Sequence, residues 1–146
     1  MAKRIRAVET PENKQARKEK AEAQKALQEK RRKDTERKQR AVADYQSQVV
    51  GIRDLAAMTA SVNWSRVYRA LQESQREHRD ALVTCEGKDV KGHQEAIKAI
   101  TTLVDEVKRP VDDLTAYINA MPLFAAHMRE RAEWNEALGR VEIRMV

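Results

Sequence analysis

The sequence predicts an all-α protein with a long basic N-terminal helix, an antiparallel αα-hairpin, short C-terminal helices and a strand-like tail. Only four Gly and three Pro occur in 146 residues, too few turn residues to connect the strands of a β-sandwich. Apolar residues recur every three or four positions from residue 42 onward, which is typical of helices with one buried face. Because aromatic residues make up only 4% of the chain, we expect a small, aliphatic core.

Positive charge is concentrated at the start of the chain. The net charge is +6, but residues 1–40 contain 15 Lys and Arg against 7 Asp and Glu, whereas residues 41–146 contain 14 against 16. This asymmetry predicts a basic arm attached to a nearly neutral domain. We therefore expect a basic helical arm over residues 1–48, a helical domain over 49–139 and a strand-like tail over 140–146.

The arm opens with a helix start signal. Thr10 is a good N-cap residue and Pro11 suits the first helical position. Residues 12–40 are mostly Lys, Arg, Glu, Gln and Ala, which favour helix. The one large apolar side chain among them is Leu27, so this helix has no face to bury. We expect the arm to lie against another molecule.

An apolar stripe begins after the arm. Its members step by three and four: Val42, Tyr45, Val49, Ile52 and Ala56. Gly51 falls within the stripe, and because Gly weakens a helix interior we expect a kink or break there. The arm helix itself is expected to end near Gln48.

The middle of the chain predicts an αα-hairpin over about residues 61–108. Ser61 or Asn63 is expected to cap its first helix. A four-residue turn follows, with Gly87 after the first helix and Asp89 as the N-cap of the second. The first helix has a stripe of Trp64, Val67, Tyr68, Leu71, Gln75, His78, Leu82 and Cys85, and the second has Val90, Ala96, Ile97, Ile100, Leu103, Val104 and Val107. Two amphipathic helices joined by a short turn pack antiparallel.

Two prolines divide the C-terminal region. Pro110 is expected to end the second hairpin helix or to begin a third, whose stripe is Val111, Leu114, Ile118 and Met121. Asp112 and Asp113 would then lie in a first helical turn, where the helix dipole favours negative charge. Pro122 breaks the chain again, and a last helix is expected over residues 124–138 and closed by Gly139.

Residues 140–146 alternate apolar and charged side chains, which predicts a short strand. A strand needs a hydrogen-bonding partner, so we expect it to pair with the N-terminal segment, another copy of the chain or the sheet of a host protein. On this hypothesis Val141, Ile143 and Met145 form a subunit contact.

No pattern of residues indicates catalysis, a cofactor or a metal. His78, His93 and His127 lie far apart in sequence without a partner at ligand spacing, and we interpret His78 as a packed or boundary residue of the helical stripe. The single cysteine, Cys85, excludes an intramolecular disulfide and has no identifiable base beside it. Phosphate-binding glycine loops are absent. We therefore expect a protein that is not an enzyme.

The two tryptophans, Trp64 and Trp134, are interpreted as packing residues of the core in preference to interface residues. No apolar run approaches the roughly 20 residues of a membrane span, and the charged N-terminus does not resemble a signal peptide. We expect a soluble protein made inside a cell, with no membrane partner.

The basic arm is the feature with functional content. Its cations could contact phosphates without reading bases, or could keep a solvated helix in solution. Because residues 1–40 contain no aromatic side chain for stacking, duplex backbone or an acidic protein surface is favoured over single strands. The expected contact residues are Lys3, Arg4, Arg6, Arg17, Lys18, Arg31, Arg32, Lys33, Arg37 and Lys38.

The hairpin segment resembles a known group of proteins. Its first helix reads WSRVYRAL from Trp64 and RDAL from Arg79, and its second reads KGHQEAI from Lys91 and continues to Leu103. This pattern over residues 64–104 resembles the small helical-hairpin proteins encoded among the structural genes of tailed bacteriophages. The resemblance implies a minor virion component of the head interior, portal or connector, which touches packaged DNA and other subunits.

Three classes of function follow from these observations. We expect a structural protein of a virion, made in the host bacterial cytoplasm, that assembles as a homo-oligomer with other subunits of portal, capsid or connector type. The alternative is a cytoplasmic protein that binds nucleic acid without sequence specificity or acts as a regulator; no helix-turn-helix supports specific reading of DNA. A scaffold that leaves after assembly is the third class.

Overall fold

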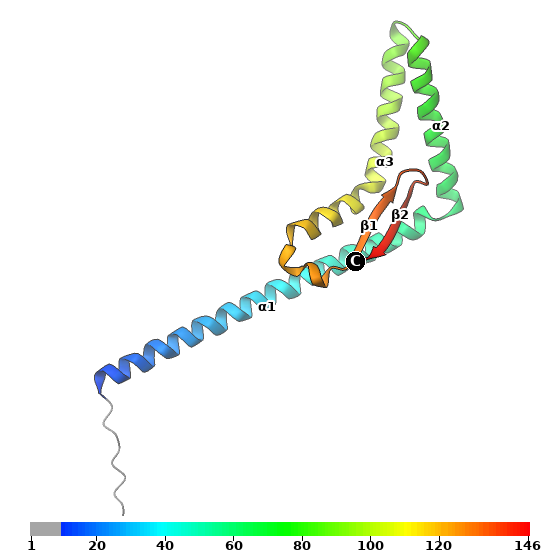
Figure 1. Cartoon of the computed structure of the whole chain (residues 1–146). Helices are drawn as coiled ribbons and strands as arrows, with labels where there is room; N and C mark the ends of the chain where they lie inside the picture. Colours follow the sequence, from blue (N-terminus) through cyan, green and yellow to red (C-terminus); the bar gives the residue numbers. More distant parts are fainter. Residues whose placement is uncertain (1–9) are drawn as a thin grey trace, which may run out of the picture. The chain divides into compact units, whose positions relative to one another are not determined.

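The computed structural model describes residues 10–146 and is mostly α-helical, as the sequence predicts (Figure 1). Its elements in chain order are the helices α1 (Pro11–Thr59), α2 (Val62–Thr84) and α3 (Lys88–Ala120), the 3₁₀ helix η1 (Pro122–His127), and the strands β1 (Glu130–Asn135) and β2 (Arg140–Met145). The chain divides into two compact units, Met1–Arg40 and Ala41–Val146. The boundary falls within α1, where its apolar stripe begins.

The start of α1 is confirmed. The backbone N–H of Asn13 donates to Thr10 Oγ1 at 3.3 Å, and that of Lys14 donates to the Thr10 carbonyl at 3.1 Å. The predicted end near Gln48 is wrong, since α1 continues through Gly51 to Thr59. A glycine inside a helix costs only about 1 kcal/mol, and the buried side chains on either side of Gly51 outweigh that cost.

The core of the unit Ala41–Val146 lies where α1, α3 and the two strands meet. Its buried members are Ala41, Tyr45, Val49, Ile52, Val111, Leu114, Ile118, Met128, Ala132 and Val141. The predicted stripes of α1 and of the second half of α3 supply six of these ten residues. Each helix buries only one face, because the opposite face of both is polar.

Pro110 lies inside α3 and neither ends nor begins a helix. A proline removes one backbone hydrogen bond and crowds the preceding turn, which bends a helix, and Figure 1 shows α3 bent partway along its length. The helix continues because Val111, Leu114 and Ile118 are buried directly after the proline. Asp112 and Asp113 therefore lie exposed in mid-helix, so their predicted role in a first turn is wrong.

The α2–α3 hairpin is confirmed, and its turn is tighter than predicted. Ser61 caps α2 by accepting from the Trp64 N–H at 3.3 Å. Gly87 has a φ of +72° and is itself the residue before α3. Asp89 therefore lies in the first turn of α3 and is not its N-cap.

The C-terminal residues form a β-hairpin where a last helix was expected. β1 and β2 pair antiparallel, with Glu130 opposite Met145 and Trp134 opposite Val141. The predicted helix over 124–138 is wrong because Ala132 and Trp134 alternate toward the core as strand residues. The predicted pairing of the tail is also wrong, since the tail finds its partner strand within its own chain.

Thr59, at the end of α1, connects this helix to β2. It is only 2% exposed, yet its hydroxyl donates to the Ala56 carbonyl at 3.2 Å and accepts from the Val141 N–H at 3.0 Å. The buried hydroxyl therefore donates one hydrogen bond and accepts another, which avoids the cost of an unpaired polar group.

The turn between the strands packs on α2 through Gly139. This residue has a φ of +64° and is buried. Its carbonyl accepts from Trp64 Nε1 at 2.6 Å, and a Cβ at this position would overlap the ring of Tyr68. Only glycine satisfies both the backbone angle and the close approach.

We predict that Gly139→Ala lowers the free energy of unfolding by about 2–4 kcal/mol, because it adds backbone strain and a steric overlap with Tyr68. Gly51→Ala is the matched control: nothing lies within 4 Å of the new methyl group, and helix propensity should stabilise the protein by about 0.5–1 kcal/mol. Urea unfolding of both variants measures the two effects, and equal changes would contradict this account.

Candidate functional site

The arm segment, residues 11–40 of α1, presents every one of its side chains to solvent. The sequence-predicted contact residues within it are all exposed helix residues: Arg17, Lys18, Arg31, Arg32, Lys33, Arg37 and Lys38. Lys3, Arg4 and Arg6 lie outside the described residues. The single helix therefore places the described members of the predicted site on one continuous rod.

Some cations of the arm segment are engaged by carboxylates of the same helix. Arg32 Nη2 lies 2.6 Å from Glu29 Oε1, and Arg32 Nε lies 3.9 Å from Glu36 Oε1. Because these side chains are about half exposed or more, each pair contributes only a few tenths of a kcal/mol to the helix. Such pairs support helix formation and can exchange for a stronger anionic partner.

The three tail residues that were predicted to form a subunit contact differ in solvent exposure. Val141 is buried in the core of its own chain, whereas Ile143 is 38% and Met145 is 65% exposed. Val141 therefore serves folding within the chain, and its assignment to a subunit contact is wrong. Contact through Ile143 and Met145 stays a prediction.

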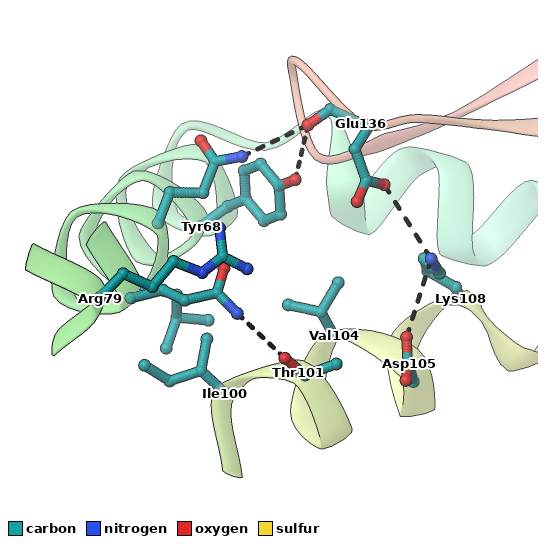
Figure 2. A pocket seen from close by; sticks show the side chains of 11 residues that line it. Tyr68, Arg79, Ile100, Thr101, Val104, Asp105, Lys108 and Glu136 are labelled. Atoms are coloured by element: carbon teal, nitrogen blue, oxygen red, sulfur yellow. Dashed lines mark hydrogen bonds and ion pairs between the residues drawn. The ribbon is translucent and has the colours of Figure 1, made fainter. Parts of the chain in front are cut away.

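A cavity of about 160 Å³ lies between α2 and α3, beside the strand turn. Figure 2 shows Lys108 held between two carboxylates, with its Nζ 3.7 Å from Asp105 Oδ1 and 4.0 Å from Glu136 Oε2. Gln75 donates to Thr101 Oγ1 at 2.9 Å across the two helices. Polar side chains that line the cavity therefore form ion pairs and hydrogen bonds with one another. The pair of Lys108 with Glu136 connects α3 to the turn between the strands.

Tyr68 lines this cavity and contacts both tryptophan rings. Its hydroxyl donates to the Glu136 carbonyl at 2.6 Å. The ring centroid lies 6.2 Å from that of Trp64 and 6.0 Å from that of Trp134, the latter edge-on. Both tryptophans are half-buried and pack within the chain. Trp134 packs against the core, as the sequence predicts, whereas Trp64 lies outside the core cluster.

The structure brings together two histidines that lie 15 residues apart in sequence. His78 Nδ1 and His93 Nδ1 are 2.7 Å apart across the α2–α3 hairpin, so one ring nitrogen donates and the other accepts. The signal was present in the sequence, because His78 lies seven positions before the turn residues 85–87 and His93 lies six positions after them. The apolar stripes alone do not indicate this contact, because His93 is not a member of the stripe predicted for the second helix.

Residues 10–146 hold no group of three or more His, Cys, Asp or Glu side chains arranged to bind a metal ion. Within the same residues, no helix is both long and apolar enough to cross a bilayer.

Comparisons with protein-family models, with curated proteins and with solved structures found no match to this chain.

Burial raises the pKa of the Tyr68 hydroxyl above its ordinary value near 10, and the nearby Glu136 carboxylate raises it further. Burial likewise raises the pKa of Tyr45, which donates to the Glu130 carbonyl at 2.8 Å, and of Tyr117, which donates to the Ala41 carbonyl at 3.0 Å. The stability that these neutral hydroxyls contribute is therefore fully present below pH 10 and is lost as the pH rises through the folded-state pKa.

We predict that Tyr68→Phe lowers the free energy of unfolding by about 0.5–1.5 kcal/mol at pH 8, because one buried hydrogen bond is lost. Between pH 8 and pH 11, the variant should lose less stability than the native chain, since one of the titrating hydroxyls is gone. Urea unfolding at both pH values gives the comparison. An equal loss in the two proteins would show that Tyr68 does not contribute to alkaline destabilisation.

Proposed function

We propose that this protein is a non-enzymatic interaction subunit whose arm segment binds the phosphate backbone of duplex nucleic acid, while the unit Ala41–Val146 is the folded domain that carries it. One observation supports the proposal above the others. Residues 11–40 are all exposed, and they contain 12 Lys and Arg against 6 Asp and Glu.

The physical argument concerns what such a helix gains from a partner. A helix without an apolar face has no packing energy and is marginally stable in water. A polyanion supplies the missing energy, because cations that neutralise phosphates release condensed counterions. Without aromatic side chains, the arm segment is better suited to a duplex backbone than to stacked single-stranded bases.

The resemblance of residues 64–104 to helical-hairpin virion proteins supports a more specific setting. In that setting the protein is a minor component of a tailed-phage particle, in the head interior, portal or connector, and packaged DNA is the polyanion. Its protein partners are other subunits of the particle, including further copies of itself. Stoichiometric recovery of the chain from purified mature particles tests this setting and distinguishes it from a scaffold that leaves.

A free-standing nucleic-acid-binding or regulatory protein of the bacterial cytoplasm is the second candidate. The observation that favours it is the core of the unit Ala41–Val146, in which the strands pair with each other and the apolar stripes of α1 and of the second half of α3 are buried within one chain. Such a unit does not need an assembly to complete its fold.

We predict that the full chain binds a 30-base-pair duplex of arbitrary sequence with an affinity that falls steeply as salt rises. A variant lacking residues 1–40 should lose this binding, while its melting temperature stays within a few degrees of the full chain because the core residues are retained. Fluorescence anisotropy across a salt series provides the measurement. Equal binding by both proteins would place the interface elsewhere, and no binding by the full chain would reject the proposal.

A further inference from the structure

The arm segment is electrostatically one-sided. At about 100° of rotation per residue, its acidic residues all fall within one sector of roughly 160° around the helix axis. They are Glu12, Glu19, Glu22, Glu29, Asp34 and Glu36. On the same geometry, an opposite sector of roughly 140° contains no carboxylate, and we call it the acid-free face. Its cations are Lys14, Arg17, Lys20, Lys25, Arg31, Arg32 and Lys38.

The acid-free face has an internal order. Lys20, Arg31 and Lys38 lie along one border, and Lys14, Lys25 and Arg32 lie along the other, with the two rows about 120° apart on the helix. Between the rows the face is mostly small or uncharged: its residues are Ala21, Gln24, Gln28, Thr35 and Gln39, together with the cation Arg17.

This order fits a groove better than a flat acidic surface. The major groove of a duplex is about 12 Å wide and admits an α-helix, with a phosphate strand along each side. Two rows of long cationic side chains would each reach one strand, while the uncharged residues between them face the groove floor. A flat acidic surface would favour cations along the centre of the face, where only Arg17 lies.

Three lysines of the acid-free face, Lys20, Lys25 and Lys38, are available for such contacts. All of them are exposed, and among the described residues the side chains of Lys20, Lys25 and Lys38 form no ion pair. Arg32 pairs with Glu29 and Glu36, and exposed pairs of this kind are weak enough to exchange for a phosphate. From Lys14 to Lys38 the rows extend about 36 Å along the axis, so several phosphates of each strand lie within reach.

The remaining sector of the helix is unsuited to the same role. Its cations, among them Lys18, Lys30, Lys33 and Arg37, are interspersed with all the carboxylates of the arm segment. Turning this sector toward a duplex would place those carboxylates against phosphates, and like charges repel. Charge alone therefore determines which way the helix must face.

We propose that the acid-free face of α1 is the duplex-binding surface and that it lies in the major groove, with one row of cations along each phosphate strand. This inference rests on the proposed function and adds the binding face of the helix, the groove that it enters and its orientation there. It assigns four of the sequence-predicted contact residues to the duplex side, namely Arg17, Arg31, Arg32 and Lys38, and it adds Lys14, Lys20 and Lys25.

Two charge-matched variants of the full chain test the proposal. The first replaces Lys20, Lys25, Arg31 and Lys38 of the acid-free face with Gln. The second replaces Lys18, Lys30, Lys33 and Arg37 of the opposite sector with Gln. Each removes four positive charges, and Gln is a comparable helix former, so circular dichroism should show equal helix content. Anisotropy with a 30-base-pair duplex is then measured for both across a salt series.

The first variant should bind at least about 10-fold more weakly at physiological salt and lose about 3–4 units of the salt-dependence slope, because each lost phosphate contact removes about 0.9. The second should stay within about 3-fold of the native chain, since distant charges are screened. Equal losses in both variants, with native binding intact, would overturn the face assignment and leave the proposed function standing. If the native chain does not bind, the proposed function itself fails.

A competition experiment separates the groove from a general attraction to negative charge. Polyglutamate at the same charge concentration should displace the native chain from duplex only weakly, because it offers one line of charge instead of two. Displacement as effective as that by unlabelled duplex would overturn the groove geometry and indicate an acidic protein as the partner.

Discussion

The structure depends on where the apolar stripe of α1 begins. Before Ala41 the helix has nothing to bury, and every described side chain is exposed. From Ala41 to Thr59, buried residues recur at helical spacing, and this stripe must be covered to be stable. The second half of α3 and the β-hairpin provide that cover. One continuous helix thus belongs to two units: its first part is fully exposed, and its second part must be covered by other elements of the chain.

Hydrogen bonds to backbone carbonyls fix how the covering elements meet. Tyr45 connects α1 to β1, Tyr117 connects α3 to α1, and Tyr68 connects α2 to the strand turn. A tyrosine buries a large apolar ring and still satisfies its hydroxyl, which suits a core with few aromatic residues. In this way three side chains, with Thr59 and Gly139, define the arrangement of the helices and the strand pair.

The sequence predicted those features that local chemistry determines: the caps at Thr10 and Ser61, the apolar stripes and the α2–α3 hairpin. It failed where tertiary burial overrides a local preference. Gly51 predicts a kink or a break and Pro110 predicts the end or the start of a helix, but buried neighbours carry the helix through both. β1 was read as helix because its apolar residues fit either period, and only the pairing with β2 decides.

The candidate site could be predicted only in part, because which side chains share a face depends on the extent and register of the helices. Composition alone identified the basic arm, but which of its cations share a face follows from the unbroken helix that the structure shows. The contact between His78 and His93 depends on the register of two helices. That register is set by the turn at Gly87 and not by either stripe.

The central claim is that the arm segment gains its stability from a duplex while Ala41–Val146 is stable alone. Hydrogen exchange of the full chain, measured by mass spectrometry with and without duplex DNA, tests it directly. We predict rapid exchange for residues 11–40 in the free protein, strong protection of them on adding duplex, and protection of residues 41–59 that is the same in both. Unchanged exchange of residues 11–40 in the presence of saturating duplex would contradict this account.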